Sequence, residues 1–238
     1  MNSRRIQIFF FTVLIKVSLF AQTSVGVEGG LSYNTYHTNI ANRSSTELTG
    51  LSGFSLDLPF RYKVYPWLYI TTAPGIVQKG YSMDRTDSLY GEYDRHINTF
   101  LQLPVGVSLQ YEWWRLRGTL DPGFYAGYWL SGRVKGAIAD IFGVSENTNS
   151  AGQTTQQFRL RPYDDPYSFL SQRDNRWQFG WVPGLGLQYH LTGRYWLTAS
   201  SRYHQSITSQ EKASVSPIPA YNHTWTFSIG GLFSLDKK

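Results

Sequence analysis

The sequence predicts an all-β protein, an eight-stranded antiparallel transmembrane up-and-down β-barrel. Apolar and polar residues alternate with a period of two in eight segments, as they do in strands that separate two environments. Tight turns alternate with long polar connections between these segments, which is typical of outer-membrane barrels. Aromatic residues gather at the ends that carry the tight turns.

The composition suits such a fold. The 238 residues provide for one domain or at most two, and charged residues make up only 16%, below the roughly 25% of soluble domains. Aromatic residues reach 16%, and there are 22 glycines. The chain has no cysteine, which excludes disulfides, thiolate metal sites and cysteine nucleophiles.

The first segment, residues 1–21, is expected to be a signal peptide that is cleaved after Ala21. Arg4 and Arg5 precede an uncharged apolar run at 6–15. The alternative is a membrane anchor, although a spanning helix needs about 20 apolar residues. The mature domain, residues 22–238, would then have to cross a membrane as a barrel.

Eight strands are expected in chain order. Their approximate ranges are 24–33, 54–64, 67–79, 101–111, 115–130, 177–189, 195–203 and 225–235. The fourth and the last alternate most cleanly; in the last, Trp225 and Phe227 lie on one face, and Thr226 and Ser228 on the other. The second, fifth and sixth follow the same pattern, the first and seventh are weaker, and the third is the least regular.

The lengths of the connections predict how the barrel is oriented in the membrane. Strands two and three, four and five, and six and seven meet at tight turns at 65–66, 112–113 and 192–193. The other connections are long and polar, at about 34–49, 81–96, 132–175 and 208–220. Short turns lie in the periplasm in outer-membrane barrels, so both termini are expected there and the protein in the cell outer membrane. The longest loop, 132–175, is the expected interaction surface, and its part from Arg159 to Leu170 is expected to fold back over the barrel mouth.

Aromatic residues at the short-turn end, among them Tyr65, Trp67, Trp113, Trp114 and Trp196, suit an interfacial girdle. A soluble lipocalin-like barrel or a β-sandwich remains the alternative, because these bury the apolar face inward and alternation alone does not say which face is inward.

A network of charges is expected inside the barrel if the apolar face meets lipid. It comprises Glu28, Asp57, Arg61, Lys63, Arg115, Arg117, Asp121 and Arg202. Eight strands leave an interior just wide enough for side chains to fill, so these residues are expected to pair and plug the lumen. A narrow channel for small solutes is the alternative.

No catalytic motif supports an enzyme, and no cofactor is expected. The chain lacks the GxSxG, HExxH and phosphate-loop motifs, and its five histidines have no metal-ligand spacing. His204 and Ser206 lie two apart on a strand, so both point the same way and resemble the His-x-Ser pair of lipid A deacylases. A lipid A or phospholipid hydrolase is therefore an alternative, although the strand's alternation sends both side chains toward the lumen.

The net charge of the chain and its expected location in the outer membrane indicate its partners. The mature chain carries 19 basic and 16 acidic residues, a net charge of +3, which with no basic run argues against nucleic acid. We expect contact with outer-membrane lipid, and with envelope or secretion proteins through the extracellular loops.

Three segments resemble the PorT-like outer-membrane β-barrel proteins of Bacteroidetes. They are Pro74–Tyr81 with its Gln-Lys-Gly, Leu101–Tyr111 followed by Gly123–Tyr128, and Asn175–Tyr189. The third segment has Gln178 where that family often has Asp. The segment Ser201–Ile207 resembles the family's seventh strand, which offers a structural reason for the His-x-Ser spacing. The resemblance implies the barrel fold and carries no information about chemistry, and PorT's own association with type IX protein secretion implies a role accessory to that secretion.

Overall fold

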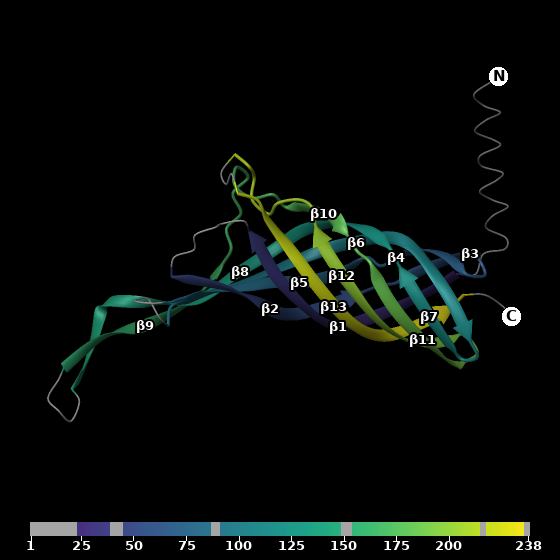
Figure 1. Cartoon of the computed structure of the whole chain (residues 1–238), viewed down its shortest axis with the longest axis horizontal. Helices are drawn as coiled ribbons and strands as arrows, with labels where there is room; N and C mark the ends of the chain where they lie inside the picture. Colours follow the sequence, from purple (N-terminus) through teal and green to yellow (C-terminus); the bar gives the residue numbers. More distant parts are fainter. Residues whose placement is uncertain (1–22, 39–44, 87–90, 149–153, 215–217, 236–238) are drawn as a thin grey trace, which may run out of the picture.

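The computed structural model describes residues 23–38, 45–86, 91–148, 154–214 and 218–235. The expected signal peptide, residues 1–21, lies outside these ranges. The described part forms a single antiparallel sheet that closes on itself as a ring of eight strands, with one hairpin extending beyond it (Figure 1).

Four of the eight ring strands are interrupted, and the structure therefore divides the sheet into thirteen elements. These are β1 (Thr23–Thr38), β2 (Thr46–Asp57), β3 (Phe60–Tyr65), β4 (Leu68–Thr72), β5 (Gly75–Arg85), β6 (Tyr93–Trp113), β7 (Leu116–Asp121), β8 (Gly123–Thr148), β9 (Thr154–Pro166), β10 (Trp177–Trp181), β11 (Gly184–Thr192), β12 (Tyr195–Ser206) and β13 (Ala220–Ser234). The pairs β2/β3, β4/β5, β7/β8 and β10/β11 each make one strand of the ring.

The ring closes between its first and last strands. β1 pairs with β13 from Ser24↔Ser234 to Thr38↔Ala220, and β12 pairs with the other edge of β13. β1 also pairs with β2 and β3, so neither edge of the barrel strands is left open. Closure satisfies the backbone groups without water, which a membrane requires.

Prolines cause the interruptions. Pro59, Pro74, Pro122 and Pro183 each stand at a break, because proline has no N–H to give to the ladder. Their carbonyls still accept: Gly26 N donates to Pro59 O at 2.9 Å, for example. The barrel wall thus continues through each break.

The apolar face is the outer one. Leu31 and Ile229 are 68% and 71% exposed, whereas Ser32 and Thr224 on the alternate positions are buried. A soluble lipocalin-like barrel or a sandwich would show the opposite arrangement. The structure therefore confirms an eight-stranded barrel with a lipid-facing exterior and a polar interior.

The short turns lie together at one end of the barrel, beside the start of β1 (Figure 1). Gly193 makes the β11–β12 turn with φ 54°, and Trp114 makes the β6–β7 turn with φ 57°. Exposed rings surround this end, including those of Tyr65, Trp67 and Trp113.

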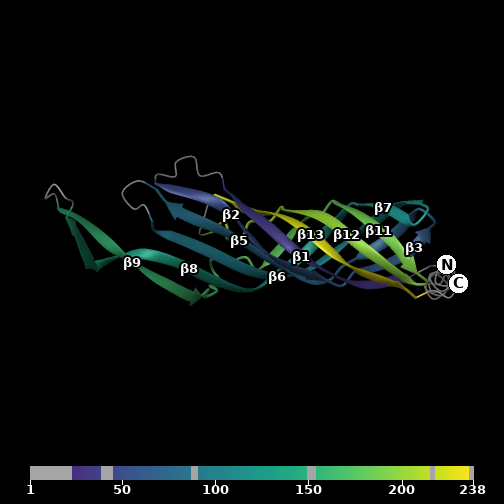
Figure 2. The ribbon, with the colours of Figure 1, turned by 90° about the horizontal axis from the view of Figure 1, so that it is seen from below.

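The expected loop 132–175 is largely regular structure, which corrects that part of the prediction. β8 runs on to Thr148 and β9 returns beside it, so the two form a long hairpin that projects past the barrel (Figures 1 and 2). The polar tract at 147–157 misled the interpretation, because a hairpin outside the membrane does not need an apolar face. Within the described ranges, no helix is long and apolar enough to span a membrane.

Candidate functional site

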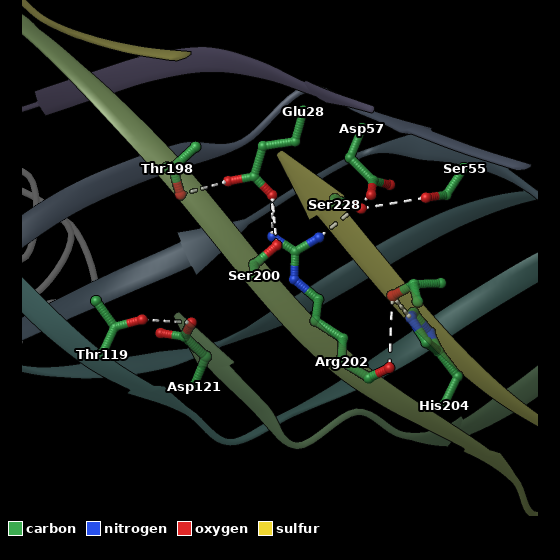
Figure 3. A network of polar contacts seen from close by, with 11 residues as sticks. Glu28, Ser55, Asp57, Thr119, Asp121, Thr198, Ser200, Arg202, His204 and Ser228 are labelled. Atoms are coloured by element: carbon green, nitrogen blue, oxygen red, sulfur yellow. Dashed lines mark hydrogen bonds and ion pairs between the residues drawn. The ribbon is translucent and has the colours of Figure 1, made fainter. Parts of the chain in front are cut away.

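The centre of the lumen holds a buried ion cluster (Figure 3). Arg202 Nη2 donates to Glu28 Oε2 at 2.7 Å, and Arg202 Nη1 donates to Asp57 Oδ2 at 3.2 Å. Thr198 and Ser200 also donate to Glu28, at 3.2 and 3.0 Å. These hydrogen bonds join β1, β2 and β12 across the interior, and they offset part of the cost of burying three charges.

A small cavity of about 40 Å³ lies beside this cluster and is lined by Arg61, Asp121 and Arg202. Thr119 Oγ1 donates to Asp121 Oδ2 at 3.0 Å. Arg61 Nη1 and Asp121 Oδ1 are both buried without a hydrogen-bond partner. The cavity has room for water between them but not for a solute of nutrient size.

The other three predicted lumen residues lie apart from this cluster. Arg117 pairs with Glu112 at 2.8 Å near the short-turn end and stacks over Trp196. Lys63 is half-buried in β3. Arg115 is exposed at the turn and packs over Trp114, because it precedes the first residue of β7.

Lys79 also lies in the lumen, where the sequence pattern did not predict it. Its side chain is fully buried, and Nζ donates to Gln178 Oε1 at 2.5 Å. The rings of Phe100 and Tyr125 lie 5.0 and 4.8 Å from Nζ. Lys79 is two residues after Val77 on β5, so both side chains point to the same face of the strand. The sequence of this strand is too irregular for its inner face to be predicted.

The His204–Ser206 pair faces the lumen, as its alternation predicts. Both residues are buried. Ser206 Oγ donates to Thr208 O at 2.7 Å, while His204 Nε2 lies 3.4 Å from Thr226 Oγ1. The histidine therefore contacts a different hydroxyl, and neither residue meets the lipid that a lipid hydrolase must reach.

An aromatic plug fills the mouth. Val77, Phe100 and Trp129 form a buried cluster inside the barrel, and Tyr167 and Phe169 pack against it from the segment after β9. The Trp129 ring lies 4.9 Å from each of these two rings. Of the range from Arg159 to Leu170 that was expected to fold back over the mouth, only the part after β9, residues 167–170, packs against the plug. The part up to Pro166 belongs to β9 and extends past the barrel with the hairpin.

Two loops join above the plug. Asn175 N donates to Gln210 O at 2.9 Å and Lys212 N to Arg173 O at 2.8 Å, which links the segment after β9 to the β12–β13 connection. We call residues 167–176 and 207–214 together the cap. The cap, the plug and the ion cluster close the lumen at successive levels.

Asp174 organises the cap. Its carboxylate accepts hydrogen bonds from Tyr167 Oη at 2.8 Å, Leu170 N at 2.7 Å and Arg173 Nε at 2.9 Å. Burial alone would raise the pKa of Asp174, but these hydrogen bonds outweigh it and hold the pKa below its usual value. Burial, together with the hydrogen bond to Asp174, raises the pKa of Tyr167.

Nowhere among the described residues do three or more His, Asp or Glu side chains gather as the ligands of a metal ion would.

The comparisons with known proteins agree with this architecture. A family model described as "Outer membrane protein beta-barrel domain" matches residues 20–210. The search of the curated proteins finds no match.

Solved barrels resemble the fold at low identity. Ail of Yersinia pestis has 14% identity and a TM-score of 0.41, covering 89% of this chain and 99% of that chain. OprG from Pseudomonas aeruginosa has 11% and 0.48, covering 91% and 97%. The outer membrane protease OmpT from Escherichia coli has 9% and 0.43, covering 90% and 96%.

The family match extends over most of the chain, and the closed ring with its apolar exterior fits it. The protein is therefore located in the outer membrane, embedded in its lipid, and belongs to the outer membrane protein beta-barrel domain family.

Proposed function

We propose that the protein is a non-enzymatic, closed barrel that anchors a display surface in the outer membrane, and that this surface serves type IX protein secretion as an accessory component. The observation that supports this proposal is that the same chain has a filled lumen and a long external hairpin. Glu28, Arg202 and Asp57 close the interior, while β8 and β9 extend outside it.

The hairpin is built to hold its shape outside the membrane. β8 and β9 pair from Arg133↔Pro166 to Thr148↔Thr154. Asp164 bonds Arg133 at 3.0 Å and Lys135 at 3.1 Å across the two strands. A rigid arm can present a partner with a fixed surface at a low cost in conformational entropy.

Support for the secretion role comes from the resemblance of Pro74–Tyr81, Leu101–Tyr111 and Asn175–Tyr189 to PorT-like proteins. Support for the absence of catalysis comes from His204 and Ser206, which are turned into a closed lumen and bonded to other groups. A narrow solute channel is disfavoured by the same closure.

The test compares secreted proteomes of three strains: wild type, a gene deletion, and a variant in which residues 139–160 are replaced by Asn-Gly. Asn-Gly closes a two-residue hairpin between Ile138 and Arg161, which are partners in the ladder and can both donate a backbone N–H. We expect both altered strains to lose the same secreted proteins, and the intact gene to restore them. A full secretome in the deletion strain would overturn the secretion role. If secreted proteins were lost in the deletion strain but not in the hairpin variant, the barrel and not the hairpin would serve secretion.

A further inference from the structure

Lys79 lies in the lumen beside the aromatic plug. Phe100 contacts both Lys79 and Trp129 on the plug side. The Tyr125 ring contacts both Lys79 and His204, with ring centroids of Tyr125 and His204 5.4 Å apart. Lys79 is therefore surrounded by aromatic rings and polar side chains.

The charge of Lys79 has no carboxylate partner. Six ion pairs form among the described residues, and none of them includes Lys79. The side chain is fully buried, and its one hydrogen bond goes to the neutral amide of Gln178. A buried ammonium in such surroundings is costly unless an opposite charge accompanies it.

Further unused polar groups lie around the same level. Gln102 and Gln178 both pair with Gly127 in the ladder, so the three residues form one row across β6, β8 and β10. A Cβ at Gly127 would lie 3.6 Å from Gln102 Nε2 and 3.6 Å from the backbone oxygen of Gln178, so the Gln102 amide lies close to this row. Gln102 Nε2 and His204 Nδ1 are buried and have no hydrogen-bond partner.

These side chains therefore offer donors and positive charge without a carboxylate. We infer that they bind a small inorganic anion of the halide class, held by Lys79 Nζ and Gln102 Nε2. Water could accept the same hydrogen bonds but would leave the ammonium charge uncompensated. The plug above, with Trp129 buried at its centre, limits the ligand to a monatomic or similarly small ion.

The experiment uses bromide as the probe. The full-length mature protein is refolded in detergent with sodium bromide or with sodium gluconate at equal ionic strength, and its melting temperature is measured in each. We expect a higher melting temperature in bromide, because a ligand that binds only the folded state stabilises it. In crystals grown with bromide, we expect an anomalous peak within hydrogen-bond distance of Lys79 Nζ.

Two variants make the test specific. Gln178→Glu places a carboxylate where Oε1 now lies 2.5 Å from Nζ, so it supplies the missing charge internally. Lys79→Met removes the cation. Both should lose the bromide-dependent shift and the anomalous peak, with folding checked by heat-modifiable migration in SDS gels.

An ordered Lys79 with no anomalous peak in the wild-type protein would overturn the inference. So would an equal bromide effect in wild type and Gln178→Glu, since that would place the ion elsewhere. If Lys79→Met fails to fold, Gln178→Glu alone decides the question.

Discussion

At the scale of single residues, burial decides which charges matter. Arg202 contacts both Glu28 and Asp57 inside the barrel, whereas Arg115 stands at an exposed turn. Sequence parity identified Glu28, Asp57 and Arg202 as inward, although the strands of Glu28 and Arg202 alternate less cleanly than the strand of Asp57. It could not place Arg115, since a residue at a turn has no defined face, or Lys79, since the third strand is irregular.

Arg202→Met should destabilise the barrel strongly, because it leaves two buried carboxylates without their cation. Breaking a buried pair in this way costs about 3–5 kcal/mol. The measurement is the free energy of unfolding by urea in lipid vesicles, with Arg115→Met as the control, expected to cost less than about 1 kcal/mol. Equal stability of the two variants would show that the cluster does not hold the barrel together.

The protonation state of Asp174 should also determine how stable the cap is. Since the pKa of Asp174 is lowered on folding, its stabilising contribution is present above the ordinary carboxyl pKa of 3.8 and is lost as pH falls through the lowered pKa. Asp174→Asn should remove the same contribution at neutral pH. Both changes should lower the hydrogen-exchange protection of the Leu170 amide, which donates to Asp174.

Asp164→Asn is the matched control for the cap, because that carboxylate is exposed and bonds Arg133 and Lys135 on the hairpin. It should leave the Leu170 amide unchanged. Unaltered protection in Asp174→Asn would mean that the plug, rather than the carboxylate, holds the cap.

At the scale of elements, period-two alternation predicted all eight ring strands, but it misjudged their ends. The apolar band of β6 stops near Leu101, yet the strand begins at Tyr93, since pairing continues outside the membrane where no face must be apolar. For the same reason, the β8–β9 hairpin was expected as a loop. The hydropathy pattern indicates which part of a strand crosses the membrane, whereas the length of the strand is set by its backbone hydrogen bonds to the neighbouring strands.

The closing seam between β1 and β13 depends on glycine. A Cβ at Gly30 would lie 1.9 Å from Phe227 O and 2.6 Å from Ser228 Cα, which are backbone atoms of β13. Gly30→Ala should therefore force the two strands apart, at a cost of about 1–3 kcal/mol. Gly118, on β7, has nothing within 4 Å of its Cβ position.

Gly118→Ala is thus the control for the seam, and its unfolding free energy should stay within about 0.5 kcal/mol of wild type. The two variants can be compared by the temperature at which each loses its heat-modifiable band. Identical temperatures would contradict the close packing of β1 on β13.

At the scale of the whole molecule, the barrel is closed by three means that act at different levels. The Glu28–Arg202–Asp57 cluster fills the centre, the plug around Trp129 fills the mouth, and the cap joins above it. The sequence could predict the first, because its charges alternate with apolar residues. It could not predict how the plug assembles, because Tyr167 and Phe169 reach Trp129 only through the tertiary path of the chain after β9.

Planar-bilayer recording can show whether the lumen is closed. The purified full-length protein, inserted from detergent into a bilayer at neutral pH, should give no discrete conductance steps. An Arg202→Met variant that still folds should conduct more readily than wild type, because part of the filling is gone. Reproducible unit steps from the wild-type protein would show that the lumen is open, since they require a continuous aqueous path past Arg202 and Trp129.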